Sequence, residues 1–400
     1  MIKWLRNIGP GTLIAAAFIG PGTVTLCTIA GVQFGFNLLW ALTLSIIATI
    51  VLQDMASRIG IVSNKGLVEV IKENISSPLL RKLVLILIIS AVIVGNGAYE
   101  AGNISGASLG ISAVFGENFS SFYPLVIGIV AFRLLFIGNY KVLERILIVL
   151  VLLMSISFIL AAALTKPNFF QLVKNAFIPT FPDQSLLTVI GLIGTTVVPY
   201  NLFLHASIAK EKWQRKEDIS IARKDTIISV ILGGLVSMTI LISAAAIGTG
   251  SVSNIIDLAK ALEPVYGSSA KYLLGLGLFA AGITSAITAP LAAAYVANSC
   301  FGWNVGLKDV RFRLSWSVIL VIGVVFSTLK FAPIEIIKFA QIANGILLPL
   351  IAMLILWIVN KSSVLGTYIN GWFQNILSVL IILITIVLGL KSILKVIELL

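Results

Sequence analysis

Helix-breaking residues interrupt two long apolar stretches of the sequence. The first contains Gly20–Thr23, which reads Gly-Pro-Gly-Thr, and the second contains Val198–Asn201, which reads Val-Pro-Tyr-Asn. Proline removes a backbone donor and clashes with the preceding turn, while glycine tolerates conformations outside the helix. We therefore expect a discontinuous helix at each place. The freed backbone groups, together with nearby hydroxyl and amide side chains, could bind a small polar solute or an ion.

Three more polar residues lie inside apolar stretches. Glu100 and Asn103 share one stretch, and His205, which is the only histidine, follows Asn201 by about one helical turn. Ionisable groups inside a bilayer are costly, so they are candidates for function by default. Each also has a purely structural interpretation as a buried, hydrogen-bonded residue. Glu100 and His205 could together carry protons, because histidine titrates near neutral pH.

Gln341 and Asn344 form another polar pair, three residues apart on one helical face. They could contact a substrate, or they could make hydrogen bonds between helices, as polar residues in membrane bundles often do. The sequence has no nucleophile–base pair and no metal-ligand spacing. We therefore predict neither an enzyme nor a bound cofactor.

The composition places all these residues in an integral membrane protein. Hydrophobic residues make up 58% of the 400 residues and charged residues 11%, whereas soluble domains are roughly 25% charged. A helix of about 20 apolar residues crosses the bilayer. We predict eleven spans, near residues 10–31, 36–57, 83–110, 121–138, 143–164, 185–209, 225–249, 270–300, 314–329, 334–359 and 373–394.

The net charge of +12 is explained by topology. With a cytoplasmic N-terminus and eleven spans, most Lys and Arg residues fall in cytoplasmic loops, as the positive-inside rule requires. The charge therefore does not indicate a nucleic-acid partner. Cys27 and Cys300 lie in apolar spans and are expected to be buried and unpaired. We predict a multi-pass protein of the plasma membrane.

The two interrupted spans are the first and the sixth, five spans apart. Five is an odd number, so two five-span halves would have opposite orientations in the membrane, as in transporters with inverted repeats. We expect a single transmembrane domain over residues 1–400. Its first repeat would cover about 1–165 and its second about 180–360, with an extra span at about 373–395. The substrate site would lie between the two interruptions, near the bilayer midplane.

Several segments resemble the Nramp family of divalent-metal transporters. The similar segments are Gly9–Thr23, Gly35–Trp40, Arg58–Val62, Phe181–Pro182 and Gly194–His205. The resemblance implies an all-α LeuT-type fold of the APC superfamily, with discontinuous spans 1 and 6 and transport by alternating access. It also implies a proton route, in which Glu100 and Asn103 match two acidic positions and His205 matches a histidine.

The sequence departs from the family at the ion-binding motifs. The family has Asp-Pro-Gly-Asn where this chain has Gly20–Thr23, and Met-Pro-His-Asn where it has Val198–Asn201. In the family, the Asp, Asn and Met side chains coordinate the ion. Carboxylate and thioether groups suit divalent metals, and neither type occupies these positions here. The leading expectation is therefore a small organic acid or amino-acid-like substrate, docked at the exposed start of a half-helix.

Two alternatives stay open. One is transport of a divalent ion of the Mg or Mn type, as the resemblance implies, and the other is a transporter-like sensor or receptor. The expected partners are the substrate and the lipid bilayer, and no oligomeric state is predicted. We expect no set of metal-ligating residues. The expected proton route uses Glu100, Asn103 and His205, and the expected substrate contacts are Gly20, Pro21, Gly22, Thr23, Thr195, Val198, Tyr200, Asn201 and Gln341.

Overall fold

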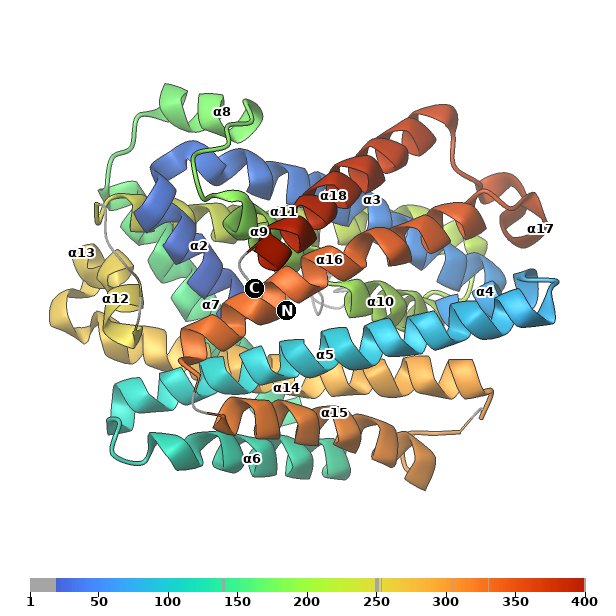
Figure 1. Ribbon diagram of the computed structural model, residues 1–400, viewed down its shortest axis with the longest axis horizontal. Coiled ribbons are helices and arrows are strands. Elements are labelled where there is room, and N and C mark those ends of the chain that lie inside the picture. Colours follow the sequence, from blue (N-terminus) through green and yellow to red (C-terminus); the bar gives the residue numbers. More distant parts are fainter. Residues whose placement is uncertain are drawn as a thin grey trace.

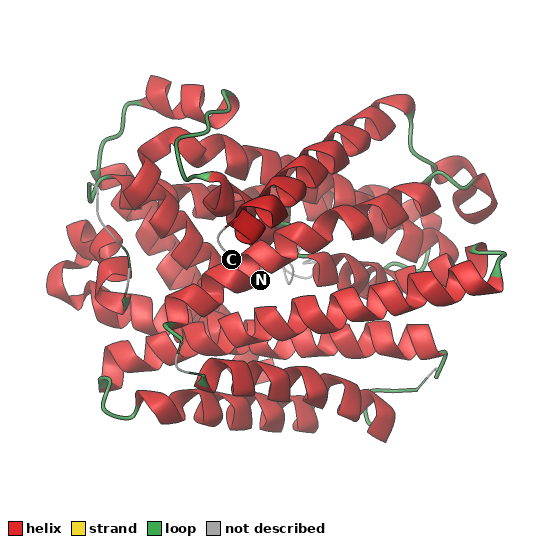
Figure 2. Cartoon of the chain, viewed as in Figure 1, coloured by secondary structure: helices red, strands yellow, loops and turns green. Residues whose placement is uncertain are grey.

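The computed structural model describes residues 19–138, 141–248, 252, 254–303, 305–329 and 331–398. These residues form helices and connecting loops without any β-strand (Figure 2). The first half of the predicted span 10–31 lies outside the described residues. The helices are α2 (Pro21–Phe34), α3 (Leu39–Ser63), α4 (Leu67–Asn74), α5 (Pro78–Phe115), α6 (Tyr123–Ile137), α7 (Lys141–Leu164), α8 (Phe169–Phe177), α9 (Leu186–Thr196), α10 (Pro199–Lys212), α11 (Ile219–Ala245), α12 (Ile255–Ala259), α13 (Glu263–Tyr266), α14 (Ala270–Phe301), α15 (Val310–Thr328), α16 (Pro333–Val359), α17 (Ser362–Leu365) and α18 (Trp372–Glu398).

Nine helical segments in the described part of the chain are long and apolar enough to cross a membrane, or ten if one bent pair counts as a span. The count differs from the predicted eleven because the segment Pro21–Ser63 contains the end of one predicted span and all of the next. The bent pair is formed by Ile148–Leu164 and Phe169–Phe177, whose axes differ in direction by 119°. The remaining predicted spans overlap the observed helices.

The helix ends follow local sequence signals. Ser77 precedes α5 and accepts a hydrogen bond from the Leu80 N–H, while Pro78 occupies the first helical position. Asp309 caps α15 in the same way by accepting from the Arg311 N–H at 2.8 Å. Such caps satisfy backbone donors that have no partner within the helix. Gly116 ends α5 with φ of 83°, a conformation that strongly favours glycine.

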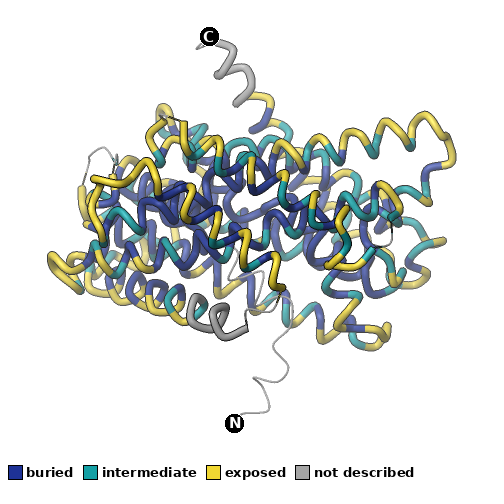
Figure 3. The backbone as a smooth tube through the Cα atoms, turned by 90° about the horizontal axis from the view of Figure 1, so that it is seen from below, coloured by how far each residue is buried: buried dark blue, intermediate teal, exposed yellow. Residues whose placement is uncertain are grey.

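The long helices pack into one bundle (Figure 1). α5 lies beside α14, α15 and α16, while α2 packs against α11 and α10 packs against α3. Buried residues fill the centre of the bundle and exposed ones follow its outer surface (Figure 3). Many exposed side chains on the long helices are large and apolar, as expected where lipid replaces water as the solvent. Cys27 and Cys300 are buried free thiols, as predicted.

Candidate functional site

Both predicted interruptions are present at the predicted residues. Gly20 is extended, with φ of −95° and ψ of 177°, and α2 begins directly after it at Pro21. α9 ends at Thr196, and α10 begins at Pro199 after two non-helical residues, Val197 and Val198. Proline at the first helical position needs no hydrogen-bond donor and already has the required φ. The local sequence therefore accounts for the position of each break.

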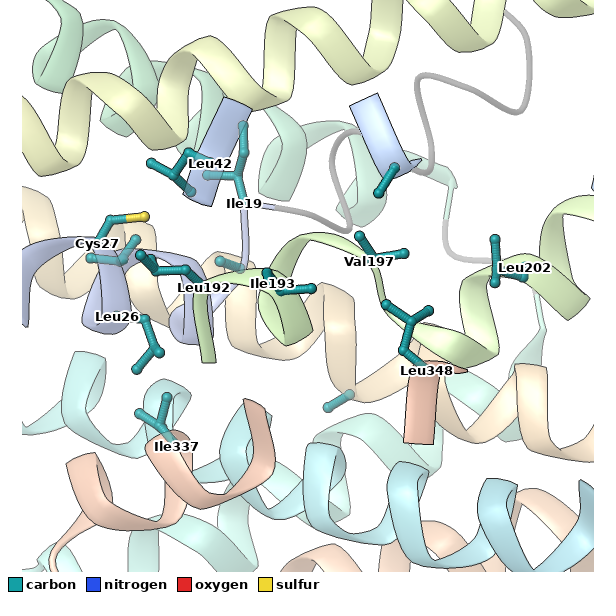
Figure 4. Close-up of a cluster of buried hydrophobic side chains, with 14 of the residues drawn as sticks. Ile19, Leu26, Cys27, Leu42, Leu192, Ile193, Val197, Leu202, Ile337 and Leu348 are labelled. Carbon is teal, nitrogen blue, oxygen red and sulfur yellow. The ribbon is translucent and has the colours of Figure 1, made fainter. Parts of the chain in front are cut away.

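The two interruptions meet inside the bundle. The hydroxyl groups of Thr23 and Thr195 lie 3.0 Å apart and form a buried hydrogen bond across 172 positions of sequence. α2 also packs against α9 along its length, since the Leu26 side chain fills the space beside Gly191. Apolar side chains, including Ile19, Ile193 and Val197, surround the breaks (Figure 4). The predicted pairing of the first and sixth spans is therefore observed at the level of side chains.

α16 brings Gln341 to the same place. A methyl group added to Gly22 would overlap the Gln341 side-chain amide, so the two residues are in close contact. A methyl group added to Gly194 would overlap the backbone of α16 at Gln341 and Gly345. Glycine at positions 22 and 194 thus allows α2, α9 and α16 to approach one another closely. The structure places Gln341 beside both breaks.

Several buried polar atoms near the breaks have no hydrogen-bond partner among the described residues. They include both side-chain polar atoms of Asn201 and Oε1 of Gln341, on side chains that are 0% and 1% exposed. Buried polar atoms are normally paired, and each exception needs an explanation. A bound solute or ion would supply the absent partners. Val198 is buried beside them and offers no polar side-chain atom.

Two tyrosines line the neighbouring part of the site. The rings of Tyr99 on α5 and Tyr200 on α10 meet edge to face with centroids 5.3 Å apart. The Tyr200 hydroxyl lies near those of Tyr99 and Thr288, but in no geometry that makes a hydrogen bond. Tyr99 is absent from the predicted site. Its position next to Glu100, in a polar segment within an apolar span, is a sequence signal that could have identified it.

Glu100 is fully buried on α5 beside Gly323 of α15. Its Oε2 atom accepts a long hydrogen bond of 3.4 Å from the Asn103 amide, while Oε1 has no partner among the residues that the structure describes. A carboxylate with so little compensation is costly in the bundle interior. Glu100 also lies close enough to Tyr200 for an electrostatic interaction. The two polar residues predicted on this span therefore contact each other.

His205 is fully buried on α10, and neither ring nitrogen has a hydrogen-bond partner in the part of the chain that the structure describes. The charged group that acts on it electrostatically is Asp54 of α3. Asn344 is buried one turn after Gln341, with its amide nitrogen unpaired. The unpaired atoms of His205 and Asn344 thus lie on α10 and α16, the helices that also carry Asn201 and Gln341.

A second polar cluster, which the sequence interpretation missed, surrounds Asp54. Its carboxylate lies 2.9 Å from Nε of Arg58 and 2.7 Å from Nε of Arg223 on α11. Arg58 also donates to the Tyr368 carbonyl at 2.9 Å and to the Asn370 side chain at 2.6 Å. Asp54 and Arg58 are spaced by four residues inside an apolar span. This spacing is the signal that could have revealed the pair.

The described residues contain no group of three or more His, Cys, Asp or Glu side chains placed to hold a metal ion. The polar groups around the breaks are instead neutral hydroxyls, amides and backbone groups, with Glu100 as the nearby carboxylate. Such a site could bind a ligand through hydrogen bonds, or a cation that keeps part of its hydration shell.

Comparison with known proteins gives a consistent result. The model of the family described as natural resistance-associated macrophage protein-like (Nramp) matches residues 11–395. The divalent metal cation transporter MntH of Listeria monocytogenes (strain HCC23) is 28% identical over 402 residues, covering 94% of this chain and 86% of its own. MntH of Ralstonia nicotianae is 28% identical over 392 residues, covering 92% of this chain and 86% of its own.

Solved structures resemble the fold over nearly the whole chain. A mutant of the Eremococcus coleocola manganese transporter superposes with a TM-score of 0.79 at 20% identity, covering 97% of this chain and 87% of that one. MhsT in complex with L-phenylalanine superposes with a TM-score of 0.62 at 16% identity, covering 96% of this chain and 97% of that one. The predicted all-α LeuT-type fold with an inverted 5+5 repeat is thus confirmed. The chain belongs to the Nramp family, and it is a multi-pass membrane transporter and not an enzyme.

Proposed function

We propose that this transporter carries a divalent metal cation by alternating access, through a site between the two interrupted spans. The observation that supports this site is the group of buried polar atoms of Asn201 and Gln341 that have no partner in the described part of the chain, beside the Thr23–Thr195 contact. A transported substrate that supplies the absent partners would explain their retention in the core. The site would become accessible from each side in turn as the half-helices and α16 move.

The relatives support a cation as the substrate. Their names describe divalent metal cation transport, and the similarity extends over more than nine tenths of this chain. The cation would be a hard ion of the Mg or Mn type that keeps several of its waters, since oxygen donors are present and the position of Val198 offers no thioether. Side-chain oxygens of Asn201 and Gln341 and carbonyls at the breaks would contact it. The Glu100 carboxylate would balance part of its charge.

A second candidate is the small organic acid or amino-acid-like solute expected from the sequence. α2 and α10 both begin at the breaks, with proline in the first turn and no side-chain cap. Uncapped helix starts present N–H groups and partial positive charge, which favours an anion. Gly20 contributes no opposing carboxylate. This candidate is supported by the electrostatics of the breaks, whereas the cation candidate is supported by the similarity to the relatives.

Proton coupling is part of the proposal. Glu100, Asn103 and His205 are buried in the bundle, and the Glu100 and His205 side chains have unpaired polar atoms. Protonation of a buried carboxylate removes one charge near the substrate, and protonation of an imidazole adds one. Either change can couple the movement of protons to the movement of substrate. We place the transporter in the plasma membrane with a cytoplasmic N-terminus, because this orientation puts most Lys and Arg residues inside.

The substitution Gly20→Asp separates the two substrates, because it adds a negative charge where the α2 helix begins. Purified protein in sealed vesicles would be tested with Mn²⁺, Mg²⁺, small organic acids and amino acids. For a cation substrate, we expect saturable metal uptake and a gain in affinity of roughly tenfold or more in the variant, since even ~1.4 kcal/mol of attraction gives that factor.

The matched control is Gly371→Asp, which adds the same charge outside the bundle, where a methyl group would meet nothing within 4 Å. It should leave uptake unchanged. Saturable uptake of an organic acid or amino acid that Gly20→Asp abolishes, without metal uptake, would show that the second candidate is correct. Ligand-dependent stabilisation without uptake of any solute would instead indicate a sensor.

A further inference from the structure

The chain turns sharply after the α7 span. Lys166 adopts a left-handed conformation with φ of 45°, and Pro167 follows it. Asn168 then caps α8 by accepting a hydrogen bond from the Gln171 N–H at 3.2 Å. Lys174 lies in the last turn, where its charge complements the helix dipole. These local signals end the span and start a separate helix of nine residues, bent by 119° from α7.

α8 has three distinct faces. Leu172 and Ala176 point into the bundle and pack against its apolar core. Gln171, Lys174 and Asn175 form a polar face on the opposite side. Between these two faces lies a third one, made by Phe169, Phe170, Val173 and Phe177. The spacing of these residues places them within roughly a quarter of the helix circumference at 3.6 residues per turn.

The third face is apolar, and no described part of the chain covers it. Phe169 and Phe170 are each 78% exposed and Phe177 is 72% exposed. Three phenylalanines left in water would lose the favourable free energy of burying their large apolar surfaces. Exposed apolar residues of α7, including Leu160 and Leu164, directly precede α8 in the chain. The face therefore comes directly after the exposed apolar surface of a membrane span in the chain.

We propose that α8 lies in the membrane–water interface, with its aromatic face inserted into the boundary between headgroups and acyl chains. A helix with a strong apolar face and a polar face, neither of them covered by protein, fits this boundary and fits neither bulk water nor the hydrocarbon centre. Lys166 and Lys174 are both exposed near the aromatic face. They are positioned to meet lipid phosphates, as basic residues at interfaces do.

The interface contact is connected to the first interrupted span. The segment after α8 accepts a hydrogen bond from Trp40 Nε1 at the Thr180 carbonyl, 2.9 Å away, and Thr180 donates to the Asn37 carbonyl at 2.9 Å. The Trp40 ring also meets Phe181 edge to face at 4.8 Å. Asn37 lies in the 3-10 turn between α2 and α3, and Trp40 lies in the first turn of α3. Lipid contact at α8 thus anchors the end of α2 that lies away from the break.

Fluorescence quenching in vesicles of phosphatidylcholine and phosphatidylglycerol tests the proposal. An environment-sensitive fluorophore would be attached to single cysteines in Phe170→Cys, Phe177→Cys and, as the matched control on the polar face, Gln171→Cys. The native thiols of Cys27 and Cys300 are buried and should not be labelled. Quenchers would be nitroxides placed near the headgroup or deep in the acyl chain, and iodide in the water.

We expect the probes at 170 and 177 to be quenched several-fold more by the shallow nitroxide than by the deep one, and only weakly by iodide. The probe at 171 should instead be quenched strongly by iodide and only weakly by either nitroxide. Strong iodide quenching at all three positions would overturn the proposal, because α8 would then lie in water. Protection at 170 and 177 from every quencher would also overturn it, because a second copy of the chain or another protein would then cover the face.

A second variant controls for loss of structure caused by labelling. Phe170→Ser combined with Phe177→Ser removes two exposed rings, so the unfolding temperature in detergent should stay unchanged. In vesicles, a probe at Val173→Cys in this background should lose its shallow-nitroxide quenching relative to the same probe in the parent chain. Unchanged quenching would show that the aromatic face does not hold α8 at the interface.

Discussion

The hydroxyl groups of Thr23 and Thr195 lie 3.0 Å apart, so the start of α2 is joined to the end of α9 by a hydrogen bond between the two interrupted spans. Thr23 follows the first break and Thr195 precedes the second, in two halves of opposite predicted orientation. A short polar contact of this kind can be exchanged for a contact with substrate as the half-helices move. It is therefore the contact at which the fold and the proposed transport cycle are most directly linked.

A double-mutant cycle on Thr23→Val and Thr195→Val tests this contact. Valine keeps the shape of threonine, but each single change leaves the other buried hydroxyl without this partner, which costs about 1–3 kcal/mol. The double variant should lose less stability than the sum of the single losses, by about 0.5–1.5 kcal/mol. Denaturant unfolding in detergent measures this. Fully additive losses would mean that the two hydroxyls do not interact.

A methyl group at position 22 should disturb function more than stability. In Gly22→Ala the new methyl overlaps the end of the Gln341 side chain, which is flexible and can move aside. We expect substrate uptake to fall several-fold while the unfolding temperature changes little, because displacement of Gln341 alters the site and not the packing of backbones. Adding Gln341→Ala should restore the space beside position 22, so the double variant should lose no more uptake than Gln341→Ala alone.

Gly194→Ala is the matched comparison, with the opposite outcome. Its methyl group would overlap the backbone of α16 at Gln341 and Gly345, which cannot move without shifting the helix. Overpacking of this kind typically costs about 1–3 kcal/mol, and we expect a loss of stability in that range here. We expect a lower unfolding temperature that Gln341→Ala does not correct. Equal stability losses in the two glycine variants would contradict the difference between side-chain and backbone contact.

Asp54→Asn should destabilise the bundle, because it leaves the Arg58 and Arg223 guanidinium groups without the carboxylate between them. Removing one partner of a buried ion pair costs about 3–5 kcal/mol. The loss should be smaller here because the Arg223 side chain is 42% exposed. Thermal unfolding would be compared with Glu73→Gln, which breaks the exposed Lys65–Glu73 pair and should cost at most about 1 kcal/mol. Equal effects of the two substitutions would rule out a structural role for the Asp54 cluster.

Glu100→Gln and His205→Ala test the proposed proton route. If these groups exchange protons during transport, the dependence of the initial uptake rate on pH, between about pH 5 and 8, should flatten in each variant. Glutamine keeps the size of Glu100 but cannot ionise, so a change in pH profile would not arise from packing alone. Glu73→Gln is again the control, since it removes an exposed carboxylate. An unaltered profile in His205→Ala would remove His205 from the route.

Many features of the fold could be predicted from the sequence because they depend on short-range chemistry. Pro21 and Pro199 start their half-helices because proline lacks an N–H, and the observed helices begin at these residues. Asn201 and Gln341 were recognised as polar residues in apolar spans, and both are buried. The family motifs supplied the LeuT-type fold, which periodicity alone would not have identified. The identity of the substrate stays a prediction, because the motif residues depart from the family at the positions that would decide it.

The amphipathic character of α8 and the cluster around Asp54 were missed for different reasons. α8 has only nine residues and follows a longer apolar span, so its three faces become distinct only when the packing of Leu172 and Ala176 is known. Asp54 was visible as an acid within a span, but its second partner, Arg223, lies 169 positions away. Pairings at such separation are set by how the helices pack and not by local pattern.

The sequence by itself determined that the chain is a bundle of membrane spans with breaks at Gly20–Thr23 and Val198–Asn201, because hydrophobicity and the backbone limits of proline and glycine act within a few residues. Only the tertiary structure decided that Thr23 meets Thr195, and that Gly22 and Gly194 admit α16 with Gln341. Those contacts join residues far apart in the chain. At Gly22 and Gly194 the three helices pack so closely that there is room for a hydrogen atom and not for a side chain.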